Sequence, residues 1–544
     1  MKSIYVTEEH DQFRALVRQF LETEVAPHAD AWEEARRIPR GIWKEMAERG
    51  FLGILFPESE GGSGADIFHA MAFLEELPRS RMGGFCAAVT VQEFIVNGAI
   101  SKQGSDELKR KYLAPSIAGE KVGAICISEP DAGSDVAAIR TTAVRDGDHY
   151  VLNGAKTWIT NGVHGDYYVV AVKTDKDAGA GGISLIAMDS DLPGIKATKL
   201  RKMGWHSSDT AEIVFEDVRV PAANLIGKEN RGFYYIMQTF ALERLAASAT
   251  AIGGSDLALE VTLKYMESRQ AFGKPINRFQ ALRHRLADLF TELEAARQLT
   301  YHTAWLYQQG EPCIKESSMA KLLTSELGKR IVDECLQFYG GFGYVEEYPM
   351  ARFYRDARVG TIVAGTSEIM REIIAKVTID GLSFAAVDER DVAGEEPAEV
   401  AVASPPTEAP TPGAARAVSS AAAPTAPAAP TAAAVPTSVA ELFRGLPSRL
   451  RPEKVDGWQT RFHFVFEKGS TWTVALDGPR CDVQEGLHGE PTCVVNTTED
   501  VYLGIETGKE NPQAAFLMGK VRVSNLNEMM RFVKVFRPLG APGG

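Results

Sequence analysis

The chain has 544 residues, of which 45% are hydrophobic, 24% charged and 9% aromatic, an ordinary balance for folded protein and a length that suits three or four domains. This excludes a small disulfide-stapled scaffold and a wholly disordered chain. The formal net charge of −13 argues against a nucleic-acid binder, because neutralising phosphates needs a positive surface. The six cysteines form no C-x-x-C pair, so we expect a reducing compartment and no metal site.

The amino-terminal residues, MKSIYVTEEHDQF, turn acidic at once and contain neither the apolar core of a signal peptide nor Arg-rich transit character. No run approaches the roughly 18 apolar residues that a membrane helix requires. We therefore expect no membrane span and a cytoplasmic location.

Residues 1–120 have helical periodicity and are predicted to form an amino-terminal helical domain. A first amphipathic helix is expected to follow Thr7, a favourable N-cap residue. Its apolar positions follow i, i+3 and i+4 spacing and should form one buried face: Phe13, Leu16, Val17, Phe20, Leu21 and Val25.

Residues 121–228 change to a strand pattern and predict a small β-domain. The pair Asn153-Gly154 is typical of a tight hairpin turn, and a second Asn-Gly pair follows at 161–162. Further strands are expected at 167–172, 183–188 and 211–215.

Residues 229–387 return to helical periodicity, with long segments at 279–308 and 315–338 that fit an antiparallel bundle. Residues 388–436 are dominated by Ala, Pro, Thr, Ser and Glu, a composition that cannot bury enough apolar surface to offset the entropy of ordering. We expect a disordered linker with a reach of about 40 Å. A plain spacer is the favoured interpretation and a recognition motif is the alternative.

Residues 437–544 predict a separate α+β module. Two segments alternate between apolar and polar or smaller residues and indicate adjacent antiparallel strands. A helix is expected at 513–518. The apolar positions of the two strands are Phe462, Phe464 and Phe466, and Trp472, Val474 and Leu476.

Four segments carry residue types suited to chemistry. Residues 124–135 (AICISEPDAGSD) form an apolar strand that runs into a turn whose N–H groups and hydroxyls can hold an anion or a planar polar edge. Residues 156–162 (KTWITNG) place a Trp beside a hydroxyl, which suits a flat ring. Residues 267–275 (ESRQAFGKP) put Arg and Lys beside Gly, which suits a phosphate. Residues 336–344 (LQFYGGFGY) break a helix at glycines, where backbone can approach a ligand closely.

Each segment by itself has a structural alternative: an ordinary β-turn, a core Trp, a solvated helix end, and a helix C-cap with its turn. In this order, and followed by AGTSEI at 364–369, they resemble the acyl-CoA dehydrogenase family over about residues 6–379. The resemblance implies an N-terminal α-helical domain, a middle β-domain and a C-terminal four-helix bundle.

The resemblance also implies an FAD enzyme that dehydrogenates an acyl thioester. In such enzymes a carboxylate removes the α-proton, and the β-hydrogen leaves as hydride to flavin N5, giving a trans-2-enoyl thioester. Ser134 is expected near both flavin and substrate. The other residues expected to bind FAD are Ile125, Ile127 and Ser128 at the isoalloxazine ring, Trp158 packed on it, Thr160 at N5, Arg269, Ala271 and Phe272 reaching the FAD of a neighbouring subunit, Gln337 and Gly341 at the adenosine end, and Thr366 and Glu368 at the pyrophosphate and ribose. Shared sites imply a homodimer or homotetramer.

The catalytic base is not where many family members carry it, immediately before Gly-Thr-Ser. That position is Ala364, which cannot take a proton. Glu243, in FALERL early in a long apolar helix, resembles the base of the isovaleryl and long-chain branches. An apolar pocket should raise its pKa, and the backbone N–H of Ala364 can still stabilise the enolate-like charge. Arg244 is expected to orient Glu243 or to contact CoA; the alternative for Arg244 is a structural salt bridge. The alternative for Glu243 is an exposed helix glutamate without a catalytic role.

The carboxy-terminal module carries GKENPQAAF at 508–516 and MGKV at 518–521, and it resembles the sterol-carrier-protein lipid-binding fold over about 439–538. That fold encloses an apolar tunnel for fatty acyl chains or sterols, which Phe516 and Leu517 are expected to line. A packed core without a ligand is the alternative.

The implied substrate is an acyl-CoA or an acyl thioester on a carrier protein, and the implied electron acceptor is an electron-transfer flavoprotein. Two alternatives stay open: an acyl-CoA oxidase that uses oxygen, and a lipid-binding or scaffold protein with a silent flavin domain. Ala364 favours the silent domain, and Glu243 opposes it.

Overall fold

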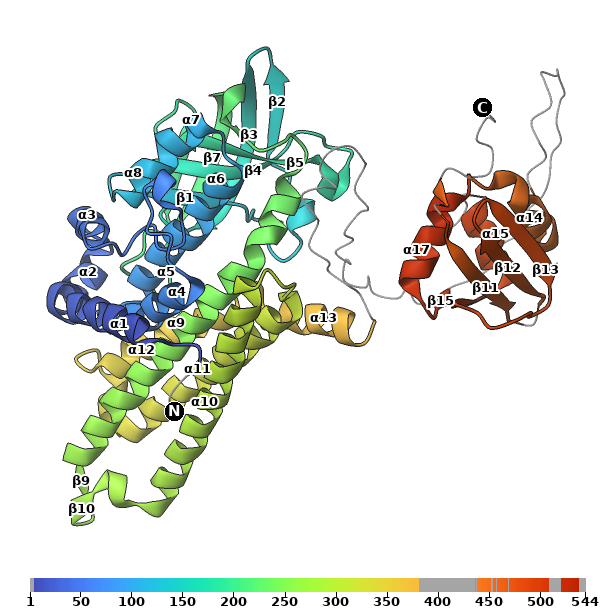
Figure 1. The fold of residues 1–544 in the computed structure, drawn as a ribbon. Coiled ribbons are helices and arrows are strands. Elements are labelled where there is room, and N and C mark those ends of the chain that lie inside the picture. Colours follow the sequence, from blue (N-terminus) through green and yellow to red (C-terminus); the bar gives the residue numbers. More distant parts are fainter. Residues whose placement is uncertain are drawn as a thin grey trace, which may run out of the picture. The chain divides into compact units, whose positions relative to one another are not determined.

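The computed structural model describes residues 4–380, 436, 438–451, 454–455, 457–467, 469–507 and 520–537. The described residues include only the last residue of the predicted linker, Pro436. The helix expected at 513–518, with Phe516 and Leu517, lies outside the described residues. The chain divides into two compact units, residues 1–408 and 409–544. Figure 1 labels the elements of each unit.

The first part of unit 1 is helical, and α1 follows Thr7 as its N-cap, as expected. Val17, Phe20 and Val25 are buried, but Leu16 is 59% exposed, so the prediction was wrong for Leu16. Val17, Phe20 and Val25 belong to one apolar cluster and Phe13 packs against it, whereas Leu16 is not part of that cluster. The helices are α1 (Glu8–Phe20), α2 (Ala29–Ala35), α3 (Gly41–Glu48), α4 (Ile67–Glu76), α5 (Gly83–Thr90), α6 (Asn97–Gln103), α7 (Asp106–Leu108) and α8 (Ala114–Ile117).

One helical stretch in the described residues, Gly83–Gln103, is long and apolar enough to cross a membrane, although the sequence predicted no such run. It comprises α5, α6 and the π-helical turn Val91–Val96 between them. Within its most apolar window, 78% is buried inside the protein. Burial in the core of unit 1 therefore accounts for its composition.

A β-domain follows, and its strands run in the order β6-β7-β3-β2-β4-β5-β8, with β1 parallel to β4. The strands expected at 167–172, 183–188 and 211–215 are confirmed. Every residue of β4 is buried, because each face of that strand packs into its own apolar cluster. The bounds are β1 (Gly123–Cys126), β2 (Thr142–Asp146), β3 (His149–Ile159), β4 (Tyr167–Lys173), β5 (Ile183–Asp189), β6 (Ile195–Lys199), β7 (Ala211–Pro221) and β8 (Leu225–Ile226).

The hairpin predicted at Asn153-Gly154 was wrong, because both residues lie inside β3. The register of β3 against β7 shifts between Leu152 and Gly154, which marks a β-bulge. Asn153 fixes this bulge: its side-chain amide donates to Asp217 Oδ1 at 2.9 Å, and its Oδ1 accepts from Asp217 N at 2.9 Å. The turn between β2 and β3 instead contains Gly147, at φ +62°.

The rest of unit 1 is a helical bundle, and the helices expected at 279–308 and 315–338 are confirmed. At 1.5 Å per residue, α9 is about 55 Å long. Figure 1 shows that α9 begins beside the β-domain and ends at the β9–β10 hairpin, at the far end of the bundle. The elements are α9 (Gly232–Ser268), β9 (Gln270–Ala271), β10 (Lys274–Pro275), α10 (Gln280–Gln308), α11 (Ile314–Tyr339), α12 (Pro349–Arg358) and α13 (Ser367–Thr378).

Unit 2 is an α+β module, as expected, with sheet order β13-β12-β11-β14-β15. The six apolar strand positions predicted for β11 and β12 are all buried. Phe443 closes this core and stacks on Trp472 with ring centroids 5.3 Å apart. The elements are α14 (Val439–Gly445), β11 (Gln459–Phe466), β12 (Thr471–Asp477), β13 (Arg480–Glu485), β14 (Cys493–Thr497), α15 (Glu499–Glu506), β15 (Arg522–Val523) and α17 (Leu526–Val535).

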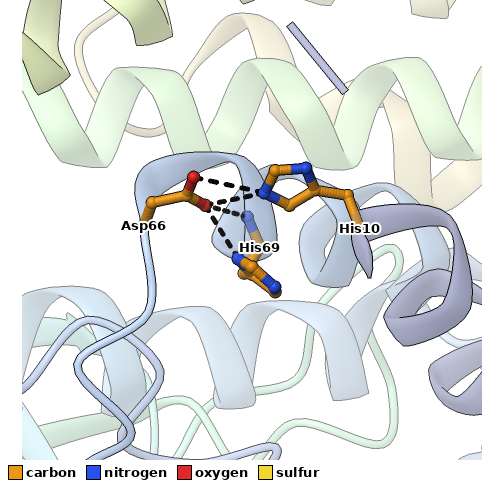
Figure 2. Close-up of side chains that lie close together, drawn as sticks. All are labelled: His10, Asp66 and His69. Atoms are coloured by element: carbon orange, nitrogen blue, oxygen red, sulfur yellow. Dashed lines mark hydrogen bonds and ion pairs between the residues drawn. The ribbon is translucent and has the colours of Figure 1, made fainter. Parts of the chain in front are cut away.

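A hydrogen-bonded joint ties α1 to α4, and Figure 2 shows its three side chains, His10, Asp66 and His69. Asp66 caps α4 by accepting from the backbone N–H groups of Phe68 and His69, each at 3.1 Å. It also accepts from His10 Nε2 at 3.0 Å and His69 Nδ1 at 2.8 Å.

The same three side chains are close enough to hold a metal ion. However, His10 Nδ1 accepts from the Thr7 backbone N–H at 2.9 Å, so the proton of neutral His10 lies on Nε2 and points at Asp66. Hydrogen bonds thus occupy the atoms that would ligate a cation. We interpret the cluster as a structural joint.

Candidate active site

The two sequence motifs of the β-domain meet where β1 and β3 leave the sheet. The Thr157 backbone N–H donates to Ser128 O at 2.9 Å. A Cβ at Gly133 would lie 3.9 Å from the Trp158 ring, so this backbone runs close to the indole. Trp158 has φ +59° and is 61% exposed, so it is not a core Trp. The pair of motifs presents a flat ring and hydroxyls on an open surface.

A buried ion pair beneath these motifs was not foreseen from the sequence. Lys156 Nζ donates to Ile127 O at 2.9 Å and to Glu129 Oε1 at 2.8 Å. Glu129 also accepts from the backbone N–H of Thr141 at 2.9 Å. Burial lowers the pKa of Lys156. Burial opposes ionisation of Glu129, but the charge and hydrogen bond of Lys156, together with hydrogen bonds from Thr141 and Arg140, outweigh burial and lower the pKa of that carboxyl. The sequence signal that could have revealed this ion pair is a lysine, Lys156, inside an apolar strand.

Glu243 lies on α9, about three turns after its start, and is only partly exposed. Desolvation raises the pKa of its carboxyl, against the opposing charges of Arg244 and Lys321. Within the described residues, no hydrogen bond or ion pair engages the Glu243 carboxylate. A carboxylate with a raised pKa and free lone pairs can accept a proton from carbon.

Arg244 is buried beside Glu243. Its Nη1 lies 3.4 Å from Ser318 Oγ, a weak hydrogen bond, and its guanidinium lies 5.2 Å from the centroid of the Phe240 ring. Burial lowers the pKa of Arg244 to about 10. The structural salt bridge considered for this residue is not present among the described contacts.

The loop that contains Ala364 and Gly365 connects α12 to α13. Both residues have left-handed backbone, with φ +54° for Ala364 and φ +86° for Gly365. Thr366 follows as the N-cap of α13, because its Oγ1 accepts from Ile369 N at 3.2 Å. Lys321 Nζ on α11 donates to Gly365 O at 2.6 Å. An Ala in the left-handed region is a strained feature of the kind found at functional sites.

A second group of predicted residues lies at the far end of the bundle. Arg269 caps α9, and its guanidinium lies 5.5 Å from the centroid of the Phe342 ring, within the glycine cluster. Phe272, in the β9–β10 hairpin, is 95% exposed. From Glu243 to Arg269 the helix spans about 40 Å. The structure therefore brings Arg269 to Phe342, the neighbour of Gly341, and separates Arg269 from Glu243 within one chain.

The donors and rings of the two groups suit FAD: an open indole for a flat ring, hydroxyls for its edge, and an arginine for a pyrophosphate. None of the residues predicted to bind FAD is buried, and neither is Ala364. Those that are exposed are Ser134, Trp158, Arg269, Phe272, Gln337, Gly341 and Glu368, and those that are partly buried are Ile125, Ile127, Ser128, Thr160, Ala271, Ala364 and Thr366.

Four family models match the chain. They are the N-terminal domain of acyl-CoA dehydrogenase at residues 7–120, its middle domain at 124–218, its C-terminal domain at 230–379, and the SCP-2 sterol transfer family at 440–537. The chain is also 40% identical over 371 residues to the mitochondrial long-chain specific acyl-CoA dehydrogenase of Sus scrofa, which covers 68% of this chain and 86% of the relative.

Two solved structures are similar to the chain. The acyl-CoA dehydrogenase from Geobacillus kaustophilus is 42% identical with a TM-score of 0.67, and the match covers 69% of this chain and 99% of that one. A glutaryl-CoA dehydrogenase from Mycobacterium smegmatis, in complex with FADH2, is 30% identical with a TM-score of 0.66, covering 70% and 97%. The fold and these matches define a flavin-dependent oxidoreductase. The chain belongs to the acyl-CoA dehydrogenase family and carries an additional SCP-2 sterol transfer domain.

Proposed function

We propose that this enzyme converts an acyl-CoA to the trans-2-enoyl thioester with Glu243 as the base. The observation that carries this proposal is the carboxylate of Glu243. It has a raised pKa and no described partner, and it interacts electrostatically with Lys321, the residue that contacts the Ala364 loop. Ala364 cannot supply the base, and in this proposal Glu243 takes that role.

Each residue then has a definite task. Bound FAD supplies the oxidising power by accepting the β-hydrogen as hydride. Glu243 takes the α-proton, and its raised pKa makes it a better base once it is ionised. The backbone N–H of Ala364 donates to the thioester oxygen, where negative charge develops. Arg244 and Ser134 contact the substrate side of the site.

The remaining predicted residues hold the cofactor in this proposal. Trp158 packs on the flavin ring, with Ile125 and Ile127 at its border. Ser128 and Thr160 hydrogen-bond the edge of the ring. The pyrophosphate, ribose and adenosine are held by Arg269, Ala271, Phe272, Gln337, Gly341, Thr366 and Glu368, the first three acting on the FAD of a neighbouring copy.

The test uses Glu243→Gln, which keeps the shape of the side chain and removes the base. Wild-type protein with bound FAD is mixed anaerobically with short, branched and long acyl-CoAs, and bleaching of the flavin is recorded. We expect at least one class to bleach the wild type, and the variant to react about 10²–10⁴-fold more slowly. Glu267→Gln, an exposed glutamate at the end of the same helix, serves as the control. Equal bleaching of Glu243→Gln and wild type would remove Glu243 from its role.

The acceptor is proposed to be an electron-transfer flavoprotein. Rapid turnover with oxygen as the sole acceptor would instead indicate an oxidase. If no acyl-CoA bleaches the wild-type flavin, acyl thioesters on a carrier protein are the next substrates to test. If these also leave the flavin oxidised, the flavin domain is interpreted as silent.

For unit 2 we propose that the module binds the lipophilic acyl group. The match to the SCP-2 sterol transfer family supports this. Its described core is filled by aromatic rings, including Phe443, Phe464 and Trp472, which offer an apolar surface but also close much of the space. A packed core without a ligand is therefore the competing interpretation. Deleting residues 439–544 and comparing KM for short and long acyl-CoAs distinguishes lipid binding from such a packed core.

A further inference from the structure

Lys321 is a buried cation in unit 1 for which fold stability offers no simple reason. It is 1% exposed, and its Nζ donates to Gly365 O at 2.6 Å. Among the described residues, no carboxylate lies within ion-pair distance of this ammonium group. Burying a charge is costly unless it is paired, so an apolar residue would fill this position at lower free-energy cost.

The carbonyl that Lys321 contacts belongs to a strained loop. Gly365 has φ +86°, and a Cβ there would lie 2.5 Å from Met370 Cε. The preceding Ala364 is held at φ +54°, in a region that residues with a side chain seldom adopt. Strained backbone persists where its surroundings over-determine it. Here the restraints are the Thr366 cap on one side and the Lys321 ammonium on the carbonyl of Gly365.

Charged groups of both signs act on Lys321: Arg244 repels its ammonium group, and Glu243, Glu326 and Glu368 attract it. Burial and the neighbouring charge of Arg244 lower the pKa of Lys321 to about 8, against the opposing effect of Glu243, Glu326 and Glu368. Lys321 in turn lowers the pKa of Glu243, which burial raises.

We propose that Lys321 is a positioning residue of the active site: it clamps the Gly365 carbonyl and thereby holds the Ala364 N–H where the thioester oxygen accepts a hydrogen bond. This inference rests on the proposed function, because it needs Ala364 N–H to face the substrate. Lys321 itself touches neither substrate nor cofactor in this role. Its charge, close to Glu243, additionally favours the enolate-like charge that forms as the α-proton leaves.

The test compares Lys321→Met, which removes donor and charge at similar length, with Lys321→Arg, which keeps both. Lys329→Met is the matched control, because Lys329 lies on the same helix and its side chain is 45% exposed. Backbone hydrogen exchange of residues 362–366 is measured by mass spectrometry in the holoenzyme. Flavin reduction at saturating and limiting acyl-CoA is then followed as a function of pH.

For Lys321→Met we expect faster exchange confined to residues 362–366. The saturating reduction rate should fall about 10–100-fold, below the loss typical of a deleted oxyanion donor, while the substrate concentration for half-saturation stays within about twofold. Because a cation near Glu243 is removed, the acid limb of the pH profile should move to higher pH. Lys321→Arg should restore most of the rate, and Lys329→Met should behave as wild type.

Wild-type exchange and rate in Lys321→Met would overturn the proposal. So would exchange that rises throughout unit 1, because Lys321 would then be only a core residue. If no acyl-CoA reduces the wild-type flavin, the proposed function fails, whereas the exchange measurement still decides whether Lys321 clamps the loop.

Discussion

At the scale of single residues, the buried pair Lys156–Glu129 couples the stability of unit 1 to the shape of its candidate flavin surface. Lys156 holds the backbone carbonyl of Ile127 and the side-chain carboxylate of Glu129, the two neighbours of Ser128. We expect Lys156→Met to lower the free energy of unfolding by about 3 kcal/mol, because it leaves Glu129 buried without its countercharge.

Urea unfolding measures this loss, and Lys156→Met/Glu129→Gln should recover part of it by removing the second charge. Lys196→Met is the control, because Lys196 pairs with Glu216 on the surface, where side-chain exposures are 68% and 60%. Its effect should stay below about 1 kcal/mol. Equal losses in the Lys156 and Lys196 variants would contradict a structural role for the buried pair.

At the scale of elements, the junction of α1 and α4 depends on Asp66, which caps α4 and accepts from His10 on α1. We expect Asp66→Ala to lower the free energy of unfolding by about 1–2 kcal/mol, since the cap and the joint are lost together. Asp66→Asn keeps an acceptor for the cap and should cost less, which thermal unfolding can measure.

This junction also predicts a pH dependence. Burial opposes ionisation of Asp66, but hydrogen bonds from His69 and His10 outweigh it and lower the pKa of the carboxyl from its ordinary value. A lowered folded pKa means that the contribution of Asp66 is present above the unfolded value and is lost as pH falls through the folded one. The stability difference between wild type and Asp66→Asn should therefore shrink below about pH 4. A difference that does not change with pH would argue against the charge.

At the scale of the whole molecule, one chain does not bring its two groups of candidate cofactor residues together. Arg269 and Glu243 are separated by about 40 Å of α9. We expect the protein to be a dimer or tetramer in which Arg269 of one copy completes the FAD site of another. Arg269→Met should weaken FAD binding at least about tenfold, because a charge-assisted contact to phosphate is lost.

Flavin content after gel filtration, with light scattering for the mass, tests this expectation. Arg283→Met, an exposed arginine near the same end of the bundle, is the control. A wild-type monomer that retains its full complement of FAD would show that the site does not cross between copies.

The second prediction at this scale concerns unit 2. If the SCP-2 domain delivers the acyl group, deleting residues 439–544 should raise KM for long acyl-CoAs and leave KM for short ones unchanged. The solved structure from Geobacillus kaustophilus is matched over 99% of its length by 69% of this chain, so the shortened protein is expected to fold. Equal effects on short and long chains would count against delivery, and would favour a packed core without a ligand.

Local sequence determined much of this protein. The period of apolar residues predicted α10, α11, β4, β5 and the two strands of unit 2, because those elements bury a continuous face whatever surrounds them. Ordered motifs predicted the family, and the pairing of Ala364 with Glu243 followed from the chemistry that a base requires. These features depend on short spacings, which a single sequence displays.

Tertiary structure decided the rest. Asn153-Gly154 has the composition of a hairpin turn, yet a partner 64 residues away, Asp217, holds it as a bulge inside a strand. Leu16 fits the apolar spacing but is exposed and lies outside the apolar cluster that buries its neighbours. The partners of Lys156 and Lys321, which are Glu129 and the Gly365 carbonyl, become known only when the segments that carry them are in place. In each case the free energy depends on contacts between residues distant in sequence, and local composition does not encode those contacts.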